Sequence, residues 1–163
     1  MRVSKIEPWA EFNEYEGQLE GEVANTLLTC HVVMNSGELW RQISIGDVVR
    51  IDLWLERSGS IGKSLAKDAA ELVQLEGVQY RATGEVVASV GEEVLLATDP
   101  QLRVDLDIPS TMAFALPRLG ESIEVSGTLR AELAEDWRPG PGPVPRGRVQ
   151  QHSRVPQREL RSG

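Results

Sequence analysis

The sequence has few of the residues that build reactive centres. Cys30 is the only cysteine, which excludes an internal disulfide, and His31 and His152 are the only histidines among 163 residues. These are too few soft ligands for a structural zinc site. Cys30 and His31 are neighbours in an expected strand, where adjacent side chains point to opposite faces, so they cannot act together as nucleophile and base. We expect no catalytic residue, no metal, no cofactor and no enzymatic activity.

Long apolar runs are also missing. Apolar runs such as Val94 to Ala97 are far shorter than the roughly 20 residues that a helix needs to cross a bilayer. The N-terminal segment MRVSKIEPWAEF lacks the apolar stretch of a signal peptide. Hydrophobic residues make up 40% and charged residues 26%, as in soluble globular proteins. The sequence therefore predicts a cytoplasmic protein without membrane association.

The net charge of −8 is unevenly distributed. Residues 1–137 hold 11 Lys and Arg against 24 Asp and Glu, a net charge of −13, whereas residues 138–163 hold six Arg against one Glu, or +5. An acidic body repels phosphate backbones and argues against broad nucleic-acid binding. The last 26 residues hold five prolines and few apolar residues, so we expect a disordered basic tail at 138–163.

An internal repeat organises the rest of the chain. Gly-Glu-Val occurs at 21–23 and again at 84–86, and Gly46-Asp47 is followed later by Gly120-Glu121. Each of the latter pairs leads into a segment in which every second residue has a counterpart in the other copy. The paired positions are Val49, Ile51, Leu53 and Leu55 in one copy and Ile123, Val125, Gly127 and Leu129 in the other. Apolar residues at period two indicate strands with one face buried.

Each copy therefore predicts a few antiparallel strands curled into a small barrel. This arrangement resembles the OB-fold, a five-stranded Greek-key barrel, over roughly residues 14–135. The resemblance implies an all-β, mainly antiparallel protein with two OB-like barrels in tandem and one short helix. We predict a first barrel with a linker helix at 1–76, a second barrel at 77–137 and the tail beyond. One larger barrel or sandwich built from both copies is the competing architecture.

The segment RSGSIGKS resembles a phosphate-binding loop but lacks a required glycine. That loop needs Gly-x-x-x-x-Gly-Lys-Ser/Thr, and the position of its first glycine is occupied by Arg57. We therefore expect no nucleotide site, and interpret 58–64 as a turn-rich connection. Helical spacing predicts a short helix at Leu65 to Ala70, while AELVQLEG at 70–77 is either a helix end or a strand.

Two tryptophans are the leading candidates for contact with a protein partner. Trp54 lies on the polar side of an alternating strand, where an aromatic ring can stack on a ligand or partner, with Arg50 on the same face. Trp40 lies in the expected loop NSGELWRQ beside Arg41. Burial beneath a loop or at a barrel end is the alternative reading of both rings. The preferred function is a non-enzymatic adaptor that recognises a protein partner.

Binding of single-stranded nucleic acid is the alternative function, because small barrels of this kind often serve it. The contact surface would then consist of basic residues around one tryptophan. These residues are Arg50, Trp54, Arg57, Lys63 and Lys67. The sequence does not define the oligomeric state.

Overall fold

The computed structural model describes residues 1–9, 15–34, 36–64, 70–107 and 116–134, with only the backbone at Ser60. Within them the chain forms nine strands, mostly antiparallel, and one short helix, which confirms the predicted all-β class. The elements are β1 (Arg2–Pro8), β2 (Glu16–Val23), β3 (Thr26–Val33), α1 (Glu38–Gln42), β4 (Ile51–Lys63), β5 (Glu71–Glu76), β6 (Gln79–Val90), β7 (Glu93–Leu96), β8 (Leu102–Asp105) and β9 (Ser122–Leu133). No helix in these ranges has the length and apolarity that crossing a bilayer requires. The predicted tail lies outside the described residues.

Five strands close into a barrel. β9 pairs antiparallel with β4 and with β6, β6 continues through β7 to β8, and β8 returns to β4 in a parallel pairing. The inward positions of these strands alternate with polar ones and form the core. Examples are Leu55, Tyr80, Val94, Leu102, Val125 and Leu129, each no more than 1% exposed. The closed five-stranded barrel is consistent with the OB-like resemblance.

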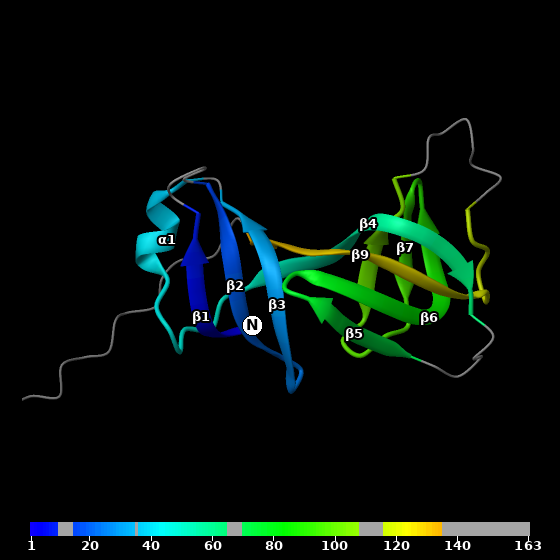
Figure 1. The fold of residues 1–163 in the computed structure, drawn as a ribbon, viewed down its shortest axis with the longest axis horizontal. Helices are drawn as coiled ribbons and strands as arrows, with labels where there is room; N and C mark the ends of the chain where they lie inside the picture. Colours follow the sequence, from blue (N-terminus) through cyan, green and yellow to red (C-terminus); the bar gives the residue numbers. More distant parts are fainter. Residues whose placement is uncertain (10–14, 35, 65–69, 108–115, 135–163) are drawn as a thin grey trace, which may run out of the picture.

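The N-terminal strands form a second unit beside this barrel (Figure 1). β1, β2 and β3 are antiparallel neighbours, and β3 pairs in parallel with β9 at 31–33 and 130–132. β1 also bonds to the chain just before β4, where Val3 N–H donates to the Asp47 carbonyl and Arg2 bridges to Val48. We call β1–β3 with α1 the first half and β5–β8 the second half.

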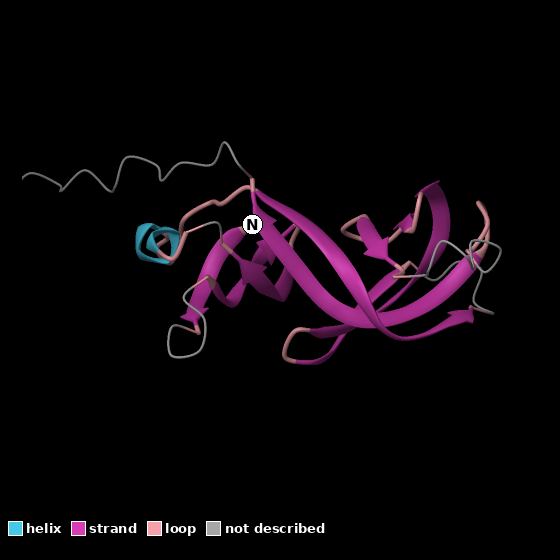
Figure 2. Ribbon diagram, turned by 90° about the horizontal axis from the view of Figure 1, so that it is seen from above, coloured by secondary structure: helices cyan, strands magenta, loops and turns pink. Residues whose placement is uncertain are grey.

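β4 and β9 run through both halves (Figures 1 and 2). β9 pairs with β6 over 122–128 and with β3 over 130–132, while β4 pairs with β9 from Ile51 to Lys63. The predicted boundary at 76/77 falls at the turn between β5 and β6. Strand pairing nevertheless crosses that boundary, because the segments 1–76 and 77–137 each contribute one of the two long strands.

The second anchor of the repeat is a duplicated turn. In both turns, 44–47 and 118–121, the first residue's N–H donates to the acidic side chain of the fourth, at 2.9 Å. Gly46 and Gly120 have φ of +95° and +80°, which favours glycine. Their N–H groups donate to Val3 and Val86, respectively. The turns therefore make Val3 of β1 the structural counterpart of Val86 of β6.

The first anchor pairs different strands and is a wrong alignment. Gly21 lies in β2, whereas Gly84 lies in β6, and the duplicated turns make β1 the counterpart of β6. Both glycines sit where another backbone approaches closely, since an added Cβ would meet the carbonyl oxygen of Arg2 or of Ala97. Close backbone packing thus explains why glycine occurs in both Gly-Glu-Val segments, although the two segments lie in strands that are not structural counterparts.

Two local predictions are corrected around residue 60. The segment 58–64 is not a loop, because β4 extends to Lys63, and a register shift between Arg57 and Ile61 absorbs its small residues. AELVQLEG contains β5, which confirms the strand alternative. The helix predicted at Leu65 to Ala70 lies, apart from Ala70, outside the described residues. The helix that is present, α1, occupies Glu38–Gln42, within the segment predicted as the loop NSGELWRQ.

Gly127 lies opposite Arg57 in the antiparallel pairing of β4 with β9, and its substitution tests how closely the two backbones approach there. A Cβ added there would lie 2.8 Å from the carbonyl carbon of Glu56, and a backbone atom cannot swing aside. We expect Gly127→Ala to lower the free energy of unfolding by about 1–3 kcal/mol in chemical denaturation. The matched control is Gly59→Ala, whose Cβ would have its nearest neighbour at 3.6 Å. Equal midpoints for the two variants would show that the backbones are not in close contact here.

Candidate functional site

Trp54 lies on the outer face of β4, as predicted, and is covered by an arginine. The Arg103 guanidinium carbon lies 5.3 Å from the centre of a Trp54 ring, and the two residues are opposite each other in the β4–β8 pairing. This geometry is a cation–π contact. Trp54 is half-buried beneath it. The ring is thus already engaged within the protein.

A polar network lies on the same outer face, at the junction of the halves. Arg130 donates to Glu56 and, at 3.1 Å, to His31 Nδ1, while His31 Nε2 lies 2.8 Å from Glu16 and the ring stacks on Trp9 with centroids 4.8 Å apart. Arginine is only a donor, so His31 Nδ1 accepts and Nε2–H donates to the Glu16 carboxylate. The network ties β2, β3, β9 and β4 together. We call these five residues the junction network.

Cys30 points to the opposite side of β3 from His31, as predicted for adjacent strand residues. Its side chain is fully buried, and Sγ lies 3.5 Å from the Leu19 carbonyl oxygen. Burial raises the pKa of the Cys30 thiol to about 12. Cys30 is therefore a core residue that stays protonated at neutral pH.

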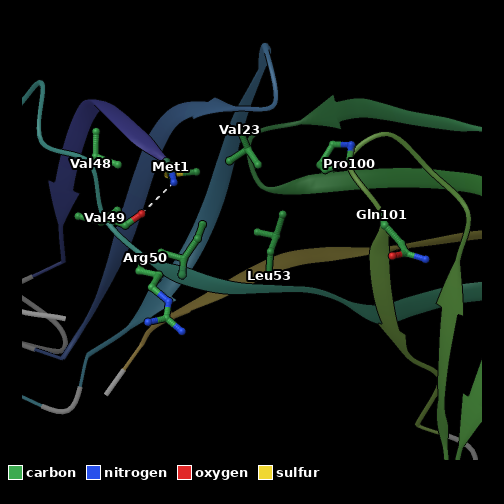
Figure 3. Close-up of a pocket in the computed structure, with 9 residues that line it drawn as sticks. Met1, Val23, Val48, Val49, Arg50, Leu53, Pro100 and Gln101 are labelled. Atoms are coloured by element: carbon green, nitrogen blue, oxygen red, sulfur yellow. Dashed lines mark hydrogen bonds between the residues drawn. The ribbon is translucent and has the colours of Figure 1, made fainter. Parts of the chain in front are cut away.

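An apolar groove opens on the inner face of β4, between the two halves. Its volume is about 670 Å³. Residues of β4 and of the chain just before it form the floor, with the first half on one side and the turn before β8 on the other (Figure 3). The lining residues are Met1, Val23, Val48, Val49, Arg50, Ile51, Leu53, Pro100 and Gln101. Only two of them have polar side chains.

The groove exists because β4 passes from one core to the other. Its inward side chains are buried at either end, Val49 being 1% exposed and Leu55 0%. Ile51 and Leu53, between them, are only half-buried, since they face the space between the halves. Val48, on the groove's wall, is 65% exposed. The groove is thus a patch of apolar surface that the fold leaves open, which often marks an interaction site.

The structure brings one of the four predicted partner-contact residues into this groove. Arg50 is one of the lining residues, although its side chain extends to the opposite side of the chain from Leu53 (Figure 3), and Trp54 lies on the outer face of β4. Trp40 is 6% exposed in α1, with its indole N–H buried and unpartnered in the described region. Arg41 is exposed on the same helix, at the far end of the first half (Figure 1). The predicted residues do not form one surface.

The basic residues of the alternative reading are also dispersed. Arg57 donates to the backbone carbonyls of Gly59, Leu106 and Asp107, which holds β4 to the end of β8. Lys63 lies 3.3 Å from the Glu121 carboxylate. Lys67 lies outside the described residues. The Arg57 guanidinium is therefore engaged in bonds within the fold.

Sequence reasoning did not identify the groove walls. Val23 follows an alternating strand and Pro100 stands in a loop, so neither carries a signal of its own. Val48 departs from the apolar–polar alternation of the strand that follows, because it is an apolar residue at an exposed position next to buried Val49. Two adjacent valines before a regular strand are the one local hint, and they do not reveal what lies opposite.

No three His, Cys, Asp or Glu side chains gather into a possible metal site in the part of the chain that the structure describes. Comparisons with protein-family models, with curated proteins and with solved structures find no match to this chain. The groove is therefore assessed on its geometry alone.

The buried Cys30 gives a direct test of the packing in the first half. Because the thiolate is the nucleophile that attacks a disulfide reagent, the raised pKa and the burial both slow the reaction. We expect labelling by a disulfide reagent at pH 8 to be at least about 100-fold slower in the native protein than in denaturant. Rapid labelling without denaturant would show that the β2–β3 core is open.

Removal of Arg130 tests whether the junction network holds the halves together. Arg130→Gln breaks the bonds to Glu56 and His31, and we expect a loss of about 1–3 kcal/mol in the free energy of unfolding. Arg81→Gln is the matched control, since Arg81 is 43% exposed and lies 3.9 Å from Glu124. That change should cost less than about 0.5 kcal/mol. Losses of equal size would assign the network no special role.

Proposed function

We propose that this protein is a non-enzymatic binding module that recognises a protein partner through the apolar groove between its halves. The groove is the single observation that carries the proposal. Exposed apolar patches rimmed by polar residues mark protein–protein interaction sites and ligand-binding grooves. The groove fits this description, because seven of its nine lining residues are apolar and the other two are Arg50 and Gln101. We further propose that both halves are OB-like rings that share β4 and β9.

A protein ligand fits this groove better than a nucleic acid does. Single-stranded nucleic acid is bound by aromatic rings for base stacking along a basic track. The groove has no aromatic residue in its lining, and the ring of Trp54 on the other face is covered by Arg103. Apolar side chains of a partner would instead cover Val48, Ile51 and Leu53, which water now reaches. A net charge of −8 also disfavours a phosphate ligand.

The groove offers a substitution that tests partner binding without touching the core. A partner captured from the native host with the full chain is purified, and its affinity is measured by calorimetry. Because Val48 is 65% exposed, Val48→Glu should fold normally. We expect it to weaken binding at least about tenfold, since a charge would be buried against apolar groups. The binding heat should also show a negative heat-capacity change.

Ile45→Glu is the matched control for this measurement. Ile45 is 71% exposed, in the turn that precedes β4, and is not part of the groove lining. Its substitution adds the same charge and should leave the affinity unchanged. Equal weakening by both variants, or none by either, would contradict the groove as the binding site. Salt-sensitive binding of labelled oligonucleotides that is lost with Trp54→Ala would favour the nucleic-acid function instead.

A further inference from the structure

One edge of β4 lacks a strand opposite it along the groove, among the residues that the structure describes. The Met1 amino group donates to the Val49 carbonyl at 2.8 Å (Figure 3). The Val49 N–H donates in turn to the Met1 carbonyl at 2.9 Å. Further along the same edge, Trp54 pairs with Arg103 of β8. In the described part of the chain, residues 51–53 pair with β9, on the other edge, and with no strand on this one. The two neighbours leave a gap one short strand segment long.

The backbone of Ile51 faces this gap. Arg50 accepts a bond from Ala134 N–H at 3.0 Å, on the β9 side. Successive residues of a strand direct their N–H and C=O groups to alternate edges. The N–H and C=O of Ile51 therefore point away from β9, into the gap, and its side chain lines the groove. An exposed edge with unpaired peptide groups is a template for another strand.

The corresponding edge in the second half is filled. β6 pairs with β9 from Gln79 to Glu85, which places Ala82 opposite Val125 and Tyr80 opposite Gly127. Both inward side chains are buried, with Tyr80 1% and Ala82 0% exposed. A strand with a large and a small inward residue, two positions apart, thus completes this half.

The duplicated turns show where the same strand would lie in the first half. They make Val3 the counterpart of Val86, so two residues earlier Met1 corresponds to Gly84. The matching strand positions make Ile51 the counterpart of Val125 and Leu53 that of Gly127. The places that Ala82 and Tyr80 fill in the second half therefore correspond to the space beside Ile51 and Leu53. That space is the groove.

We propose that the partner enters the groove as an extended segment that adds to β4 as an antiparallel strand. Its backbone pairs with the N–H and C=O of Ile51, and it places one large and one small apolar side chain, two residues apart, over Leu53 and Ile51. In this recognition mode the main-chain bonds supply affinity and the side-chain pockets supply specificity. The inference rests on the proposed function and specifies how the protein recognises the partner's backbone and side chains.

The second half supplies the probe for this proposal. The peptide acetyl-QYRAT-amide copies residues 79–83, which stop before the place that Met1 fills in the first half, and acetyl-YQART-amide exchanges its inward and outward residues at the first four positions. Each is titrated into the full-length protein, and amide hydrogen exchange is followed by NMR. The first peptide should slow exchange of the Ile51 amide at least tenfold at saturation, and the exchanged peptide should not. Absence of Ile51 protection at saturating peptide would overturn strand addition.

Two substitutions at Ile51 separate strand addition from simple apolar binding. Ile51→Pro removes the N–H that faces the gap and no bond to β9, and proline is tolerated at such an edge. Ile51→Ala keeps the N–H and removes most of the side chain. We expect peptide affinity to fall at least tenfold with Ile51→Pro and at most threefold with Ile51→Ala. Equal losses would overturn the proposal. The two Ile51 variants could lose peptide affinity equally while Val48→Glu still weakens binding of the partner. That result would leave the groove as the binding site and rule out strand addition as the way in which the partner binds.

Discussion

The antiparallel pairing of β4 with β9 is the contact that both halves need. The N-terminal part of β9 closes the barrel with β6, and its C-terminal part holds β3, so one strand belongs to two cores. The two long strands approach closely at Gly127, where the backbone of Glu56 leaves no room for a Cβ. β4 comes from the segment 1–76 and closes the barrel of the second half, whereas β9 comes from the segment 77–137 and pairs with β3 of the first half. Neither half is therefore complete without a long strand from the other segment. The junction network reinforces the β4–β9 pairing on the outer face of the sheet, because Arg130 bonds to Glu56 and His31.

The passage of β4 from one core to the other accounts for the groove. A strand that leaves one core and enters another must expose some inward residues between them, and Ile51 and Leu53 are those residues. In the second half the equivalent stretch of β9 is covered by β6, with Tyr80 and Ala82 beneath it. The two faces of the junction therefore differ. On the outer face the side chains bond to and stack on one another in the junction network. The inner face has exposed apolar surface and an open strand edge, where we propose that a partner binds.

Local pattern was enough to predict much of the fold. Period-two alternation identified the strands around Leu55 and Leu129, and the repeated Gly-acid pair before each strand is a real structural duplication. Pattern could not show that the strands are exchanged between halves, because pairing partners are long-range and leave no local signal. It also failed where small residues continue a strand through a register shift, as after Arg57. The site was largely missed for the same reason, since the groove depends on which strand is absent opposite Ile51.

Cooperativity is the property that tests shared strands most directly. Native-state hydrogen exchange, measured against denaturant concentration, gives separate opening free energies for amides in β2, such as Leu19, and in β7, such as Val94. If both halves depend on the β4–β9 pair, the two amides should exchange through the same global opening. Their opening free energies should then converge to one value with the same dependence on denaturant. A first half that opens at lower denaturant while Val94 remains protected would show that the barrel stands alone and that the strands are not jointly required.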